Sequence, residues 1–188
     1  VALGVLGAGL LTWDMIRRLK SASLELADRE ASARHESKHD NLSGLPNRTH
    51  FVERLQERLD ALVQTRQGQR IVVAYLDVDR FKDVNDTMGH HAGDRLIVSV
   101  AERLRKCLGR DDFLSRFGGD EFAVMRVASN EAEIEDLTAR LRSAFEESFD
   151  LVGQKILMTC SVGVAVAPDH GASPDELMRH ADIALYQG

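Results

Sequence analysis

The chain has 188 residues, which is enough for one domain of ordinary size with an extension but too few for two complete catalytic domains. With 44% hydrophobic and 29% charged residues, it is neither a fully disordered chain nor a polytopic membrane protein. The formal net charge of -6 argues against a broad cationic surface, so we expect no nucleic-acid partner.

The N-terminal segment predicts a membrane anchor. Residues 1–13 are almost entirely apolar, and the cationic residues Arg17, Arg18 and Lys20 follow, as at the cytoplasmic end of a membrane span. A span needs about 20 apolar residues. Because the chain begins with Val1, we expect a fragment whose upstream part completes a transmembrane helix in the inner (cytoplasmic) membrane, with the rest in the cytoplasm. A signal-peptide remnant or a buried helix is the alternative.

Residues 14–39 predict a helical stalk. From Met15 to Ala33, apolar residues recur at alternating spacings of four and three, with an interruption at Arg29. This spacing suits a short parallel coiled coil, but a single solvated amphipathic helix fits it equally well. We expect the helix to end before the turn at residues 43–46, Ser-Gly-Leu-Pro.

Alternating apolar periods from residue 40 onward predict an α/β domain. Helical spacing is found at residues 51–62, 96–108, 134–145 and 177–186. Strand patterns are found at residues 71–76, 113–117, 122–127 and 156–166. We therefore expect a central mixed sheet that contains a hairpin and is flanked by helices.

Two acidic clusters stand at predicted strand ends. Residues 77–79, Asp-Val-Asp, close an apolar strand, and residues 118–121, Gly-Gly-Asp-Glu, form the predicted hairpin turn. Glycines permit turns that side chains would block. Placed in neighbouring strands, these carboxylates would surround one point and would require a cation, and hard oxygen ligands select Mg²⁺ or Mn²⁺.

Such a cation site favours nucleotidyl or phosphoryl transfer. A magnesium ion held by few carboxylates completes its shell with water and substrate phosphates. The alternative is that each acidic pair is a solvated strand end without a ligand, which is the more frequent role of such pairs taken separately.

Three blocks of sequence resemble the GGDEF family of diguanylate cyclases. Residues 116–122, Arg-Phe-Gly-Gly-Asp-Glu-Phe, are similar to the family signature, and residues 40–48 are similar to its domain-opening segment. Residues 77–94 supply the third block. The resemblance covers residues 40–188 and implies a palm-like fold related to class III nucleotide cyclases. It also implies that a homodimer condenses two GTP molecules into cyclic di-GMP and releases two pyrophosphates.

The resemblance implies a metal-dependent catalytic centre. Asp77, Asp120 and the backbone carbonyl of Val78 would hold Mg²⁺ or Mn²⁺. Glu121 would ligate a metal or help to deprotonate the attacking ribose hydroxyl, so that Asp120 and Glu121 are the expected catalytic residues.

The resemblance also assigns residues to the phosphates of the substrate. Phe81 and Lys82 lie where the loop of the family wraps the phosphates through backbone amides, and Gly118 and Gly119 let the ligand approach the backbone. For Lys82, a surface lysine screened by water is the alternative.

Asn85 and Asp94 match the residues that read guanine in the family. A carboxylate accepts hydrogen bonds from the ring N–H and the exocyclic amine of guanine, which adenine does not present in that arrangement. Taken by itself, Asp94 also fits a helix N-terminal cap.

The sequence departs from the family pattern at two places. Where members with product inhibition carry Arg-x-x-Asp, residues 109–112 read Gly-Arg-Asp-Asp, so we expect no allosteric inhibitory site. The chain also stops at Gly188, before the Lys and Arg that usually reach the triphosphate, so we expect a truncated C-terminus. A catalytically silent GTP-binding regulatory or dimerisation module of a longer signalling protein is therefore the alternative function.

Overall fold

The computed structural model describes residues 38–65 and 68–187 of the chain. The predicted end of a transmembrane helix at residues 1–13, and all but the last two residues of the predicted stalk, therefore lie outside the described residues. Within the described ranges, no helix combines the length and the apolar composition that crossing a membrane requires.

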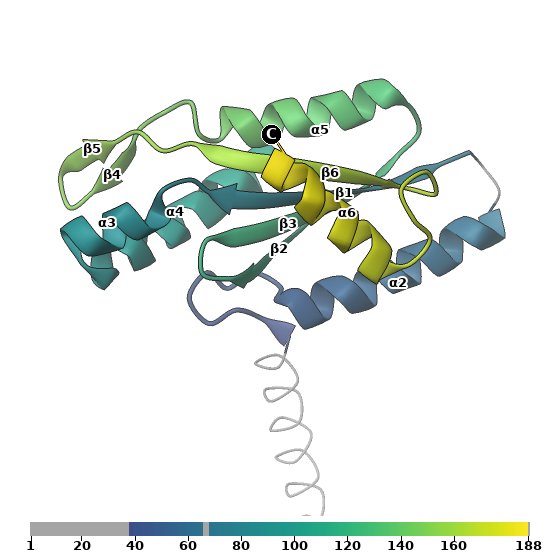
Figure 1. The fold of residues 1–188 in the computed structure, drawn as a ribbon, viewed down its shortest axis with the longest axis horizontal. Helices are drawn as coiled ribbons and strands as arrows, with labels where there is room; N and C mark the ends of the chain where they lie inside the picture. The colour runs from purple at the N-terminus through teal and green to yellow at the C-terminus, as the bar shows by residue number, and fades with distance from the viewer. Residues whose placement is uncertain (1–37, 66–67, 188) are drawn as a thin grey trace, which may run out of the picture. The chain divides into compact units, whose positions relative to one another are not determined.

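The centre of the domain is a four-stranded sheet in the spatial order β2-β3-β1-β6 (Figure 1). Strand β1 (Arg70–Val78) lies between β3 (Glu121–Ala128) and β6 (Cys160–Ala167), and β2 (Phe113–Gly118) pairs with β3. Strand β1 has a paired strand on each side and helices over both of its faces. Side chains on both faces are therefore buried, which explains the continuous apolar run in its sequence.

The strand pairings correct one detail of the predicted fold. A mixed sheet is what the sequence predicts, whereas the three pairings of this sheet are all antiparallel. An apolar run indicates a buried strand but carries no information on the direction of its neighbours. The expected fold class, helices flanking a central sheet, is confirmed.

Helices cover both faces of the sheet. On one face, alternate residues of β1 form a core with α3 (Phe81–Met88), α4 (His90–Cys107) and α5 (Glu131–Ser143). On the other face, a second core joins β1 to α2 (Arg48–Thr65) and α6 (Pro174–Gln187). The period of two along a strand sends successive side chains to opposite cores.

Helix α6 can lie close to the sheet because β6 has a glycine beneath it. A Cβ atom added to Gly163 would overlap the backbone carbonyl oxygen of Ala181 and the backbone nitrogen of Leu185. The missing side chain therefore sets the distance between the closing helix and the sheet.

Some elements differ from the predicted ones. The strand expected at residues 156–166 is divided, because β5 (Gln154–Ile156) pairs with β4 (Phe149–Leu151) in a separate hairpin and β6 starts only at Cys160. The apolar pattern predicts neither β4 nor α3. Both elements are short, and α3 has a single buried residue, Val84, which gives no apolar period.

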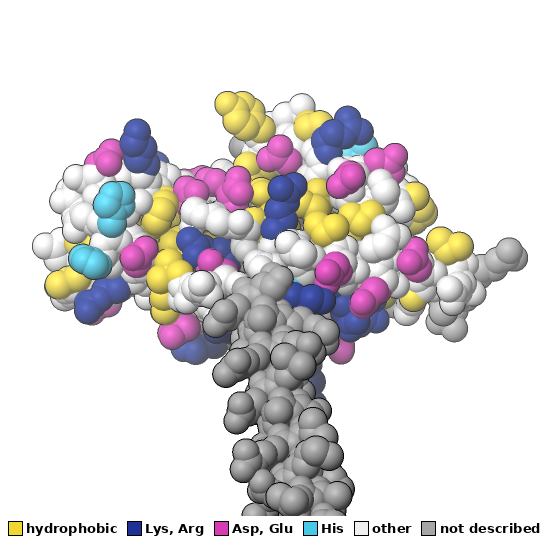
Figure 2. All heavy atoms as spheres, turned by 90° about the horizontal axis from the view of Figure 1, so that it is seen from below, with side chains coloured by type: hydrophobic (Ala, Val, Ile, Leu, Met, Phe, Trp, Pro, Cys, Tyr) yellow, Lys and Arg dark blue, Asp and Glu magenta, His cyan; other side chains and the backbone are white. Residues whose placement is uncertain are grey.

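The surface carries charges of both signs. On the face shown in Figure 2, acidic and basic side chains are interspersed with apolar ones over the described residues.

Candidate functional site

The end of β1 and the turn between β2 and β3 bring the two acidic clusters together. Asp77 lies directly opposite Glu121 in the pairing of β1 with β3. The backbone N–H of Val78 donates to the backbone carbonyl of Asp120 at 3.2 Å. The residues of the two acidic clusters are therefore neighbours, because β1 and β3 are adjacent strands.

Two glycines shape the turn that carries Asp120. Gly118 has φ of 146° and Gly119 has φ of 52°, both in the region that L side chains rarely adopt. A Cβ atom at either position would meet nothing within 4 Å. Backbone conformation rather than lack of space therefore requires glycine here, and the open space leaves the turn accessible to a ligand.

The carboxylates of the site repel one another. Burial, followed by the negative charges of Asp120, Glu121 and Asp79, raises the pKa of Asp77 to about 6. Over residues 38–65 and 68–187, none of these four carboxylates forms an ion pair with Lys, Arg or His. The cluster therefore has no cationic partner within the described part of the chain.

The donor chemistry fits a hard divalent cation, because every side-chain donor in the cluster is a carboxylate oxygen. In the part of the chain that the structure describes, no three His, Cys, Asp or Glu side chains stand close enough together to hold a metal ion. The strand pairing nevertheless makes Asp77 and Glu121 neighbours, and their role as ligands of Mg²⁺ or Mn²⁺ remains a prediction.

Asp79, which directly follows β1, forms hydrogen bonds to the segment at the start of β6. Its carboxylate accepts hydrogen bonds from Oγ1 of Thr159 at 2.6 Å and from Oγ of Ser161 at 2.8 Å. Its backbone N–H donates to the carbonyl of Thr159 at 3.0 Å. This role of Asp79 has no signal in the sequence, because Thr159 and Ser161 lie about 80 positions away along the chain.

A buried arginine joins the turn to the domain-opening segment. The guanidinium of Arg116 donates to the carbonyl of Gly119 at 2.7 and 3.2 Å and to Oδ1 of Asp40 at 2.8 Å. Burial opposes ionisation of Asp40, but hydrogen bonds from Ser43 and Arg116 lower its pKa below the usual value. Two of the three matched sequence blocks are therefore in direct contact.

Tyr75 is a further polar residue beside the acidic cluster. Its hydroxyl donates to Oε2 of Glu121 at 3.1 Å. Burial raises the pKa of Tyr75 well above its ordinary value, and the charge of Glu121 acts in the same direction. The sequence shows Tyr75 only as a member of an apolar strand, so its contact with Glu121 has no sequence signal.

Helices α3 and α4 bring the predicted guanine-reading residues together. A Cβ atom on Gly93 would overlap Oδ1 of Asn85, and Gly93 directly precedes Asp94. Asp94 is exposed, and it is not a helix cap, because α4 begins at His90 with Gly89 in the cap position. The capping interpretation of Asp94 is therefore wrong.

The predicted phosphate-binding residues begin α3. Phe81 is half-buried against the main core, and Lys82 is exposed. The helix follows Arg80, whose φ of 60° is left-handed, and its N-terminus has no side-chain cap. Backbone N–H groups of an uncapped first turn are suited to an anion.

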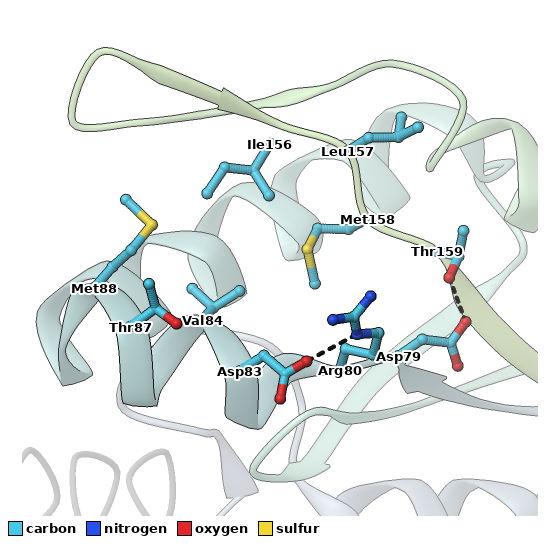
Figure 3. Close-up of a pocket in the computed structure, with 10 residues that line it drawn as sticks. All are labelled: Asp79, Arg80, Asp83, Val84, Thr87, Met88, Ile156, Leu157, Met158 and Thr159. Carbon is cyan, nitrogen blue, oxygen red and sulfur yellow. Dashed lines mark hydrogen bonds and ion pairs between the residues drawn. The ribbon is translucent and has the colours of Figure 1, made fainter.

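A pocket of about 390 Å³ lies between α3 and the chain after β5 (Figure 3). Val84, Met88 and Met158 line its apolar part, and Asp79 and Arg80 stand at its polar side. Among the described residues, the pocket lining does not include the predicted substrate-binding ones. This cavity therefore does not coincide with the predicted nucleotide site.

The incomplete inhibitory motif has a structural role. The Asp112 side chain is only 3% exposed and accepts two hydrogen bonds of 2.6 Å from the guanidinium of Arg126. It also accepts a hydrogen bond of 2.7 Å from the backbone N–H of Gly109. Asp112 therefore ties the start of β2 to β3.

Comparison with protein families and known proteins gives a consistent result. The family model described as diguanylate cyclase, GGDEF domain, matches residues 37–188. The cyclic di-GMP phosphodiesterase NbdA of Pseudomonas aeruginosa is 37% identical over 170 residues, which are 90% of this chain and 22% of the relative. The diguanylate cyclase TpbB of the same species is 34% identical over 174 residues, 92% of this chain and 40% of the relative.

A solved structure shows the same fold. The crystal structure of a sensory box/GGDEF family protein from Caulobacter crescentus superposes with a TM-score of 0.75 and 38% sequence identity. The match covers 80% of this chain and 96% of that chain. The chain spans less than half the length of the two curated relatives named above.

Proposed function

The chain belongs to the GGDEF family of diguanylate cyclase domains, and from this we propose that it condenses two GTP molecules into cyclic di-GMP, releasing two pyrophosphates. The observation that carries the proposal is the position of Asp77 opposite Glu121, with Asp120 bonded through its carbonyl to Val78. This arrangement brings the acidic residues of both clusters to the same end of the two central strands.

In the proposed mechanism, Asp77, Asp120 and the carbonyl of Val78 hold the divalent cation. When bound, Mg²⁺ or Mn²⁺ neutralises triphosphate charge and lowers the pKa of the ribose hydroxyl. Glu121 either adds a ligand or accepts the proton that the 3′-hydroxyl releases. The uncompensated negative charge of the cluster supports a cation at this place.

The substrate is held on both sides of this centre. The uncapped start of α3 supports phosphate binding through the backbone N–H groups of Phe81 and Lys82. The adjacency of Asn85 to Gly93 and Asp94 supports reading of guanine between α3 and α4. The open turn at Gly118 and Gly119 supports close approach of the substrate to the backbone.

The reaction needs two copies of the chain. Each 3′-oxygen bonds to the α-phosphorus of the other GTP, the bond from that phosphorus to pyrophosphate breaks, and each hydroxyl proton passes to a base. Since the product has two-fold symmetry and each copy carries one site, we place the reaction at the interface of a homodimer.

One observation favours a second candidate, a GTP-binding regulatory module. NbdA, which is named a phosphodiesterase, matches this chain over only 22% of its length. A domain of this family can therefore be part of a protein named for another activity. In such a protein, this chain would bind GTP without turning it over and would regulate an attached domain.

The test is incubation of the purified protein with GTP and Mg²⁺ or Mn²⁺, followed by chromatographic separation of the nucleotides, with Asp120→Ala as control. Cyclic di-GMP from the wild type, and none from the variant, supports the cyclase. Metal-dependent GTP binding without product supports the regulatory module.

The apolar residues 1–13 support anchoring of the whole protein in the inner membrane, with the stalk at residues 14–39 between the anchor and the domain. Fractionation of the full-length protein tests this part of the proposal. Recovery in the membrane pool is expected, and recovery in the soluble pool would contradict it.

A further inference from the structure

Tyr75 occupies the face of β1 that carries Asp77. The two residues are two positions apart, so their side chains point to the same side of the sheet. The cross-strand neighbours of Tyr75 are Ala123 on β3 and Gly163 on β6. Both are small, so the ring of Tyr75 faces no bulky side chain directly across either strand pairing.

Aromatic packing fixes the ring of Tyr75. Its centroid is 5.4 Å from that of Phe117 in an edge-on contact, and Phe117 makes a similar contact of 5.2 Å with Phe51 of α2. Phe117 directly precedes Gly118 of the signature turn. The ring therefore packs against the residue before the turn while its hydroxyl bonds to Glu121 after it.

Glu121 needs an external constraint to keep one orientation. A glutamate has three side-chain torsions that must be held if its carboxylate is to keep one orientation, and Glu121 stands directly opposite the like-charged Asp77. In the described part of the chain, the hydroxyl of Tyr75 is the side-chain donor to the Glu121 carboxylate. The 3.1 Å bond engages Oε2 and leaves Oε1 for another partner.

We propose that Tyr75 is a positioning residue, whose hydroxyl holds the carboxylate of Glu121 in the orientation that the cyclisation of GTP requires. The inference rests on the proposed function, because Glu121 needs a fixed orientation only if it acts on a ribose hydroxyl or on a metal. Tyr75 itself does not touch the reacting atoms in this role.

The test compares two single-atom deletions. Tyr75→Phe removes the hydroxyl and keeps the ring, and Tyr186→Phe is the matched control because Tyr186, the other tyrosine of the chain, is 93% exposed. For Tyr75→Phe we expect kcat to fall about tenfold with the KM for GTP within about twofold, since a hydrogen bond to a charged group is lost. For the control Tyr186→Phe, we expect the kcat and the KM for GTP of the wild type.

A rescue variant separates the donor from the ring. Tyr75→4-aminophenylalanine retains the aromatic packing and offers an N–H donor at the same place, so we expect kcat to return to within about threefold of the wild type. Thermal unfolding of each variant shows the fraction that is folded at the assay temperature, and rates are compared per folded protein.

The outcomes are distinct. A Tyr75→Phe kcat within about twofold of the wild type would overturn the positioning role even if the unfolding temperature falls, because the hydrogen bond would then be structural only. A raised KM with unchanged kcat would also overturn it. If the wild type makes no cyclic di-GMP, both the proposed function and this inference are overturned. If the wild type and Tyr75→Phe are equally active, only the positioning role of Tyr75 is overturned.

Discussion

Asp77 shows, at the scale of a single residue, how a cluster of carboxylates conflicts with stability. Its carboxyl lies in a partly buried position and faces the negative charges of Asp120, Glu121 and Asp79. Like charges held close together in the folded state make the folded protein less stable than it would otherwise be. The cost is largest when no cation is present to offset the repulsion.

A first prediction concerns the metal-free protein with Asp77→Asn. The pKa of Asp77 in the folded state, about 6, lies above its unfolded value near 4, so its stabilising contribution is present below pH 4 and is lost as the pH rises through 6. At pH 8, in a chelating buffer, the variant should be more stable than the wild type by about 1 kcal/mol, discounted for partial exposure.

Urea unfolding at pH 4 and pH 8 checks this prediction. The difference between the variant and the wild type should grow with pH, and the exposed Asp86→Asn should show no such growth. A wild type that is equally or more stable than Asp77→Asn at pH 8 would mean that the carboxylates do not repel one another in solution.

A second prediction concerns Asp112. Because its buried carboxylate pairs with Arg126, Asp112→Ala should lower the free energy of unfolding by about 3 kcal/mol, while the exposed neighbour Asp111→Ala should change it by less than about 0.5 kcal/mol. Urea unfolding measures both. Equal losses in the two variants would show that the ion pair contributes little.

The same ion pair bears on regulation. Asp112 is already bonded to Arg126 and Gly109, and no arginine stands at position 109, so we expect no tight inhibition by cyclic di-GMP at this place. Steady-state assays with added cyclic di-GMP check this expectation. Submicromolar inhibition would contradict the expectation.

At the scale of elements, the contact of α6 with β6 depends on one glycine. A Cβ atom on Gly163 would overlap backbone atoms of Ala181 and Leu185, which a rotamer change cannot relieve. Gly163→Ala should therefore displace α6 and lower the free energy of unfolding by about 2 kcal/mol. Gly109→Ala is the control, because the nearest atom to its new Cβ is 3.4 Å away. Matching losses in both variants would refute the close approach.

The elements also show what the sequence predicts and what it does not. The long helices and the buried strand β1 follow from their apolar periods. Helix α3 does not, because eight residues with one buried side chain give no period. The break between β5 and β6 depends on hydrogen bonds from Thr159 and Ser161 to Asp79, about 80 positions away along the chain.

In the candidate site, too, some contacts can be predicted from the sequence and others cannot. The sequence predicts that Asp77 and Glu121 stand at strand ends, and the pairing of β1 with β3 makes them neighbours. The bond between Tyr75 and Glu121 is not predicted, since the partners are 46 positions apart and a tyrosine in a strand reads as a packing residue. Pairings of this kind depend on register, which the apolar pattern alone does not give.

At the scale of the whole molecule, the proposed reaction predicts that turnover depends on dimerisation. The initial rate per chain should rise with protein concentration and then level off as the dimer saturates. An excess of inactive Asp120→Ala should reduce the rate of the wild type, because mixed dimers hold one competent site. Sedimentation velocity under the same conditions gives the fraction of dimer, and a monomer with the full rate would contradict the prediction.

The bond between Asp40 and Arg116 defines where the autonomous folding unit begins. These residues are 76 positions apart, and the Arg116 side chain is only 9% exposed. A shortened protein that starts at Leu42 would keep both apolar cores but would leave a buried guanidinium without its carboxylate, beside the carbonyl of Gly119. The minimal unit that folds with an intact signature turn therefore starts no later than Asp40.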